Sequence, residues 1–195
     1  MKVCIVAEGC YPYVVGGVSG WINSMIKSFP NIEFILLTIV ANRSVRGKFV
    51  YELPENLTQV YELYLEDCEW EEGERERKVR KRFHLSKKER TELTNLVMNR
   101  KIEWGVIFDL FQRKGVSVDD LLMGPDFFQI VRECYKRQYA NIVFSDFLWT
   151  MRSIYLPLFW TLKMKVPQAD LYHCVATGYA GVLGSMAKHF HNSSL

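Results

Sequence analysis

The sequence predicts an α/β fold in which a parallel sheet is flanked by helices and carries a helical insertion. Two apolar runs, residues 3–7 and 33–40, are separated by a segment with apolar residues at helical spacing. A third apolar run, residues 169–175, is followed by another helical segment. Uninterrupted apolar runs are typical of strands buried on both faces of a parallel sheet, so the pattern predicts a Rossmann-like domain.

The first 65 residues predict most of the sheet. A strand at 3–7, a helix at 21–29 and a strand at 33–40 form one βαβ unit, which should be right-handed with parallel strands. Residues 48–53 and 59–65 are rich in β-formers and predict two more strands, with a turn at Pro54-Glu55-Asn56 between them.

The composition then changes to a strongly charged segment. Residues 66–76 carry seven carboxylates and residues 75–90 carry nine Lys or Arg side chains. One interpretation is an acidic and basic docking segment. The other is a solvated insertion that is partly helical. The carboxylates have no histidine among them and fit no known cation-binding loop, so no metal role is assigned.

Residues 86–163 show a helical pattern throughout and predict three or four helices. Ser86 and Glu89 have capping-box spacing at a helix start. Asp119 and Asp126 are the predicted N-caps of two later helices. The charged and helical insertion therefore covers about residues 66–165, and Val166-Pro167-Gln168 ends its last helix.

The sheet resumes after the insertion. Residues 169–175 predict a returning core strand, and residues 177–188 predict a helix. A doubly wound domain normally continues into another strand at this point, whereas this chain stops at Leu195. We therefore expect residues 1–195 to be one domain of a longer protein, with a natural terminus as the alternative.

Composition excludes several classes of function. The net charge of +3 and the lack of a basic stripe argue against nucleic acid as a partner. Five scattered cysteines without a CxxC pair indicate reduced thiols in a cytoplasmic protein and no zinc site. Residues 144–162 are apolar but contain Arg152, which argues against a membrane span. Their aromatic side chains leave open a surface that docks on a membrane-bound partner.

Ligands of open α/β sheets bind at the carboxyl ends of the strands, where the sequence places the loops 8–17 and 173–178. These loops supply the backbone N–H groups of Gly16 and Gly17, the Glu8 carboxylate, the Tyr11 and Tyr13 phenols, the His173 imidazole, the Thr177 hydroxyl and Gly178. The alternatives are a tight turn whose glycines only supply positive φ and a structural His173. Adjacent strand residues point to opposite faces, which argues against a dyad of His173 and Cys174.

Three segments resemble the N-terminal half of PelF-type glycosyltransferases, which belong to the retaining glycosyltransferase family 4 with the GT-B fold. They are residues 7–21 (AEGCYPYVVGGVSGW), 147–153 (FLWTMRS) and 169–181 (ADLYHCVATGYAG). Cys10 and Cys174 depart from the family pattern, since smaller residues are commoner there. The resemblance implies an N-terminal, acceptor-side domain of a GT-B enzyme whose C-terminal donor domain is absent.

The resemblance also implies roles for individual residues. Gly16 and Gly17 would approach the diphosphate of a nucleotide-sugar donor such as a UDP-sugar. His173, as the catalytic residue, and Thr177 with Gly178 would line the sugar site, and Glu8, Tyr11 and Tyr13 would contact substrate. The implied partners are a nucleotide-sugar, a glycan acceptor and a membrane-bound polysaccharide-synthesis complex, with no metal or other cofactor. The expected location is the cytoplasm, and a peripheral position at the inner face of the cell membrane is left open.

The implied activity is transfer of a sugar to a growing polysaccharide in exopolysaccharide biosynthesis. The alternative is a nucleotide-binding or scaffold module of such a complex without catalysis. An NAD-dependent oxidoreductase is disfavoured because GxGxxG is absent and Glu33 begins the second strand instead of ending it.

Overall fold

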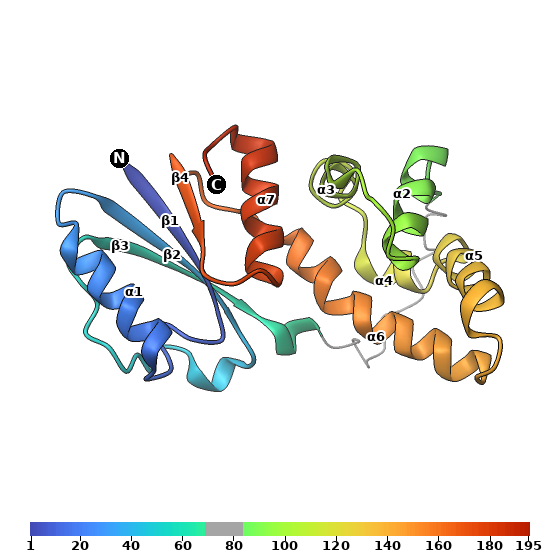
Figure 1. Cartoon of the computed structure of the whole chain (residues 1–195), viewed down its shortest axis with the longest axis horizontal. Coiled ribbons are helices and arrows are strands. Elements are labelled where there is room, and N and C mark those ends of the chain that lie inside the picture. The colour runs from blue at the N-terminus through green and yellow to red at the C-terminus, as the bar shows by residue number, and fades with distance from the viewer. Residues whose placement is uncertain (69–83) are drawn as a thin grey trace, which may run out of the picture. The chain divides into compact units, whose positions relative to one another are not determined.

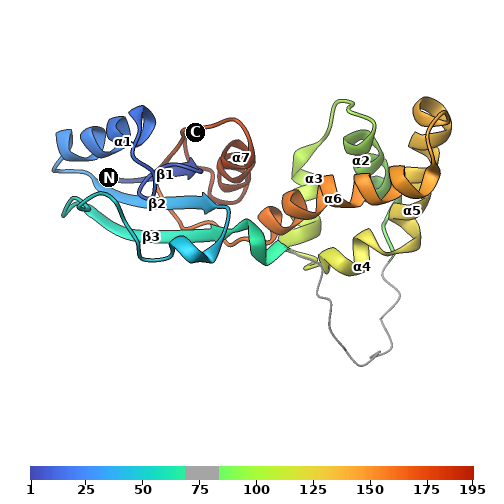
Figure 2. The same cartoon turned by 90° about the horizontal axis from the view of Figure 1, so that it is seen from below.

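A computed structural model describes residues 1–68 and 84–195. The chain divides into two compact units, each described by itself below (Figures 1 and 2). The first unit comprises Met1–Cys68 and Met164–Leu195, and the second comprises Glu69–Lys163. The predicted docking or solvated segment lies mostly at residues 69–83, outside the described residues.

The first unit is built on a four-stranded parallel sheet (Figure 1). Its strands are β1 (Lys2–Glu8), β2 (Glu33–Val40), β3 (Leu57–Tyr64) and β4 (Leu171–Cys174). Their order is β3-β2-β1-β4, and every neighbouring pair is parallel. The predicted α/β, Rossmann-like sheet is therefore confirmed. Strand β1 has β2 on one side and β4 on the other.

Helix α1 (Gly17–Ser28) covers one face of this sheet. Its fully buried Ile22 and Ile26 pack with Val3 and Ile5 of β1 in one apolar cluster. Complete burial of an Ile side chain contributes about 1.5–3 kcal/mol to folding, so these helical positions fix α1 on the sheet.

Helix α7 (Tyr179–His191) packs against β1 and β4 and covers the opposite face. Side chains alternate along a strand, so Cys174 of β4 points away from the α1 face. The Cys174 Sγ lies 3.2 Å from the carbonyl oxygen of Ala180 in α7. A Cβ on Gly184 would overlap this sulfur, so a glycine is needed there for α7 to lie close to the strand.

The predicted strand at 48–53 is wrong. These residues form an irregular segment that follows the short 3₁₀ helix η1 (Arg43–Val45). The Val50 N–H donates to the carbonyl oxygen of Pro12 at 3.0 Å, and the Tyr51 ring lies 5.3 Å from that of Tyr11. Packing beneath the loop after β1 thus outweighs the β-propensity of the segment.

The second unit is helical across its described residues. It contains five α-helices where the pattern predicted three or four, and a single π-helical turn follows α5. Part of the underestimate arises from α4, which at five residues is too short to show periodicity. The elements are α2 (Lys87–Val97), α3 (Trp104–Gln112), α4 (Val118–Leu122), α5 (Pro125–Cys134), η3 (Tyr135–Tyr139) and α6 (Phe144–Lys163). The 3₁₀ turn η2 (Leu65–Cys68) ends the described N-terminal part of the first unit.

One of the three predicted helix caps is correct. The capping box of Ser86 and Glu89 is formed at the start of α2. The N-cap of α4 is Ser117, whose side chain accepts the N–H of Asp120, and not Asp119. The N-cap of α5 is Gly124, with proline at the first helical position, which leaves Asp126 free for other contacts.

The apolar run at 144–162 forms α6, which belongs to the core of the second unit. Its Arg152 is 8% exposed and donates from Nε to the carbonyl oxygen of Leu122 at 3.0 Å. Burial lowers the pKa of this guanidinium. Across the described residues, no helix combines the length and apolar character that crossing a membrane requires.

Candidate functional site

The carboxyl ends of β1 and β4 lie next to each other, and β4 is the strand at one edge of the sheet. After β1 the chain forms β2 on one side of β1, and after the insertion it forms β4 on the other side. Their following helices, α1 and α7, lie on opposite faces. Doubly wound sheets bind ligands at the carboxyl ends of the strands where the strand order reverses in this way.

The glycines that open α1 are not required by the fold. Gly16 is the N-cap with φ 178°, an extended backbone that any residue adopts, and Gly17 has no positive φ. In this loop only Gly9 has a positive φ, at 64°. A Cβ on Gly16, Gly17 or Gly20 would meet no atom within 4 Å. The interpretation that Gly16 and Gly17 only supply positive φ to a tight turn is therefore wrong.

The N-terminus of α1 has no side-chain cap and no acidic residue in its first turn. The first N–H groups of a helix have no carbonyl partner within it, and the helix dipole makes this end positive. The Gly16 N–H donates to the Tyr51 hydroxyl oxygen at 3.5 Å. The first turn thus presents backbone donors on an exposed, glycine-lined surface.

Tyr11 supports this loop from inside instead of facing substrate. Its side chain is fully buried, and its hydroxyl donates to Oδ1 of Asn23 at 3.3 Å. Its carbonyl oxygen accepts the Thr38 hydroxyl at 3.1 Å. Burial, with a smaller contribution from Tyr51, raises the pKa of Tyr11 to about 12. The predicted substrate role of Tyr11 is therefore replaced by a structural one.

Tyr13 is held in a similar way. Its ring packs edge-on against Phe49 at 5.5 Å between centroids. Its hydroxyl oxygen is buried and has no hydrogen-bond partner within the part of the chain that the structure describes. The phenol thus points into the protein, which removes the basis for a direct substrate contact by Tyr13.

His173 lies beside the first turns of α1. It is exposed and occupies the same face of the sheet as α1, and it pairs in register with Ile5. Its ring centroid lies 5.6 Å from that of Trp21, at an interplanar angle of 41°. The Trp21 side chain is 48% exposed and follows Gly17 by one helical turn. The structure therefore adds Trp21 to the site, and the available signal in the sequence was its place directly after the glycine loop.

Glu8 caps the other helix at this edge. Its Oε2 accepts the N–H of Ala180 in the first turn of α7 at 3.3 Å. A Cβ on Gly178 would lie 2.9 Å from the same oxygen, so the glycine makes room for the carboxylate. Thr177 is exposed beside this contact. Glu8 and Gly178 thus serve the local fold, and an anion is disfavoured at the N-terminus of α7.

The thiols of Cys4 and Cys174 are not placed for nucleophilic catalysis. Cys174 points to the α7 face and His173 to the α1 face, which confirms that they form no dyad. Burial raises the pKa of Cys174, and it raises the pKa of Cys4, with a further contribution from Cys174, to about 12. Both groups remain neutral thiols near pH 7, whereas a nucleophile or metal ligand needs the thiolate.

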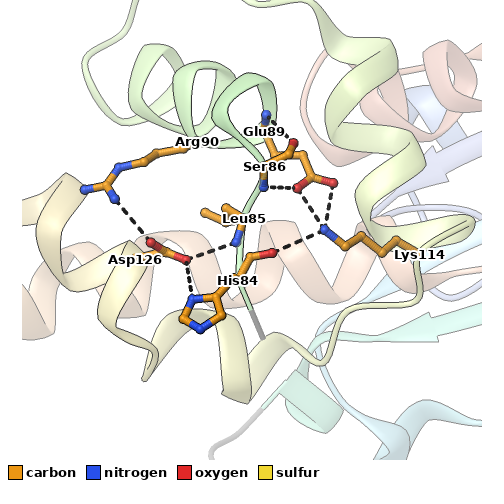
Figure 3. Close-up of polar contacts among 7 residues, drawn as sticks. All are labelled: His84, Leu85, Ser86, Glu89, Arg90, Lys114 and Asp126. Carbon is orange, nitrogen blue, oxygen red and sulfur yellow. Dashed lines mark hydrogen bonds and ion pairs between the residues drawn. The ribbon is translucent and has the colours of Figure 1, made fainter. Parts of the chain in front are cut away.

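A second polar cluster lies at the start of α2 in the second unit (Figure 3). Asp126 accepts the Leu85 N–H at 3.0 Å and pairs with Arg90 at 3.2 Å, and the His84 ring nitrogen lies 4.0 Å away. Asp126 thereby joins the first residues after the undescribed segment to the start of α5.

The other half of this cluster centres on Glu89. Its carboxylate accepts the Ser86 N–H at 2.6 Å and pairs with Lys114 at 2.9 Å (Figure 3). Burial alone would raise the pKa of Glu89, but the hydrogen bonds from Lys114 and Ser86 outweigh it and lower the pKa. The carboxylates of Asp126 and Glu89 are engaged by Leu85, Arg90, Ser86 and Lys114. We therefore assign the cluster to anchoring the start of α2 and not to catalysis.

No group of three potential metal ligands occurs among residues 1–68 and 84–195. In comparisons with known proteins, the model of a family described as a domain of unknown function, DUF3492, matches residues 1–195. No curated protein and no solved structure matches the chain.

Proposed function

The chain belongs to the DUF3492 family, and we propose that it is the N-terminal, acceptor-side domain of a retaining glycosyltransferase. The donor would be a nucleotide-sugar such as a UDP-sugar, and the acceptor would be a growing polysaccharide or glycan. The family, which is associated with glycosyltransferases, supports this proposal together with the resemblance to PelF-type enzymes.

The observation that carries the proposal is the open glycine surface at the start of α1. Gly20, in the helix interior, costs about 1 kcal/mol relative to alanine, and Gly17 is the first residue of the same helix. Neither a positive φ nor contact with the rest of the chain requires them. An external group that comes close to the backbone explains their presence.

The chemistry of this surface suits sugar transfer from a nucleotide diphosphate. Departure of the diphosphate develops negative charge, which backbone N–H groups at a helix start stabilise. Residues 8–21 and 171–181 contain no Lys or Arg. In this proposal the cations that complete the diphosphate site belong to the donor domain of the full-length protein.

Trp21 and His173 would hold the sugar. The apolar face of a pyranose ring packs against an aromatic ring, and the imidazole can exchange hydrogen bonds with sugar hydroxyls. Both side chains are exposed and lie beside the N–H groups of the first turn. Transferred sugar and leaving diphosphate would therefore occupy adjacent parts of one edge of the sheet.

The test is steady-state sugar transfer by the longest reading frame that contains residues 1–195, with Gly17→Val as the variant. The valine side chain has room in the folded chain but blocks close approach of a ligand to the backbone. We expect kcat/KM to fall by at least about 100-fold, as for loss of a transition-state donor, with little change in stability.

Ser24→Val is the matched control, because Ser24 is exposed two turns further along α1. It should leave kcat/KM unchanged. Equal kcat/KM for native protein and Gly17→Val would contradict the proposal. Nucleotide-sugar binding without any turnover by the longest reading frame would favour the non-catalytic binding module instead.

A further inference from the structure

The turn between α5 and α6 exposes apolar side chains at one end of the second unit. We call residues 136–143 the η3 tip. Three of its side chains are large, apolar and exposed: Tyr139 at 42%, Ile142 at 43% and Val143 at 62%. Figure 2 shows this turn as the connection at which the chain reverses from α5 into α6.

A hydrogen bond and two aromatic contacts hold the backbone of the η3 tip in place. The Tyr135 hydroxyl donates to the carbonyl oxygen of Ile142 at 2.7 Å. The Tyr139 ring stacks on Phe147 of α6 with centroids 4.8 Å apart, and Tyr135 packs edge-on against Phe144 at 5.0 Å. Since the backbone is held from both sides, Ile142 and Val143 cannot fold back into the core.

Two cations belong to the η3 tip itself. Lys136 and Arg137 are exposed, and neither makes an ion pair with any residue that the structure describes. Over residues 132–146 the three cations, Arg132, Lys136 and Arg137, outnumber the two carboxylates, Glu133 and Asp146, by one. A protruding turn with apolar residues and unpaired cations complements a surface with anionic headgroups over an apolar interior.

We propose that the η3 tip docks the protein on an anionic membrane surface. Ile142 and Val143 enter the boundary between headgroups and acyl chains, while Lys136 and Arg137 contact lipid phosphates. The aromatic Tyr139 lies between them, at the depth that amphipathic rings prefer. This proposal does not depend on the sugar-transfer activity, because all its residues lie in the second unit.

The test is cosedimentation of the chain with vesicles of phosphatidylglycerol and phosphatidylcholine, and with vesicles of phosphatidylcholine alone. The native chain should bind the anionic vesicles and lose binding as salt is raised. The double variant Ile142→Ser with Val143→Ser should bind at least about tenfold more weakly, because the apolar area entering the membrane is lost. Lys136→Glu with Arg137→Glu should lose binding to the anionic vesicles as well.

Met123→Ser is the matched control. Met123 is 42% exposed in the same unit but precedes α5, about 15 Å from the η3 tip by the length of a ten-residue helix. It should bind as the native chain does. Circular dichroism checks that every variant is folded.

Two results would overturn the proposal: no binding of the native chain to anionic vesicles, or equal binding by the native chain and the Ile142→Ser, Val143→Ser variant. A concentration-dependent dimer that this double variant abolishes, without vesicle binding, would assign the tip to a second copy of the chain and would equally overturn it.

Discussion

At the scale of single residues, substitutions at the glycines of α1 test whether the fold or a ligand requires these glycines. Gly20 is a helical residue with open space where a Cβ would project. We expect Gly20→Ala to raise the free energy of unfolding by about 0.5–1 kcal/mol, because alanine loses less backbone entropy on folding. Urea unfolding measures this change. A decrease in stability would show that contacts at Gly20 differ from those described.

Cys4 provides a residue-scale prediction about pH. Burial raises its pKa from 9.0 to about 12, so the folded chain holds the neutral thiol where the unfolded chain ionises. Its contribution to stability is complete below pH 9.0 and is lost as pH rises toward 12. The loss amounts to roughly 1.4 kcal/mol for each pH unit in that window.

The measurement is urea unfolding from pH 8 to pH 11 for the native chain and Cys4→Ala. The variant should be less stable at pH 8, because it leaves a small cavity, but its stability should fall less steeply above pH 9.0. Parallel curves for the two proteins would exclude the assigned role of Cys4. Comparing slopes cancels the contributions of tyrosines and lysines, which the two proteins share.

At the scale of elements, the contact of Glu8 with α7 links the end of the first strand to the start of the last helix. Glu8→Ala should lower stability by about 1 kcal/mol, as expected for loss of a helix cap. Gly178→Ala should also destabilise the chain, because its Cβ would displace the carboxylate.

The double variant Glu8→Ala with Gly178→Ala tests whether these effects share one contact. Its loss of stability should be clearly smaller than the sum of the two single losses, since the clash disappears with the carboxylate. Additive losses in urea unfolding would mean that the helix cap and the glycine act independently.

Sequence patterns predicted elements well where burial and capping are local. The strand at 33–40 and the capping box at Ser86 were correct at their exact residues. The segment 48–53 failed because Val50 and Tyr51 bind the distant loop at residues 11–16. Asp126 failed as a cap because a glycine and a proline already define that helix start and its carboxylate binds Leu85 and Arg90.

At the scale of the whole molecule, the proposed activity requires the donor domain that the resemblance to PelF-type enzymes implies. The described edge of the sheet offers backbone donors, an indole and an imidazole, but residues 8–21 and 171–181 offer no cation for a diphosphate. We therefore predict that residues 1–195 alone show no multiple-turnover transfer from UDP-sugars. A radiolabelled-sugar assay measures this, with the longest reading frame as the positive control. Sustained transfer by residues 1–195 would contradict the prediction.

The sequence by itself determined the parallel sheet, its helices and the two loops at its carboxyl edge, because apolar periodicity and glycine placement act over short stretches of chain. Only the tertiary structure decided what each loop residue does. It buried Tyr11, joined Trp21 to His173, and placed the Glu8 carboxylate on Ala180, 172 residues away. Such contacts depend on strand order and on which face each side chain occupies, and no local pattern records them.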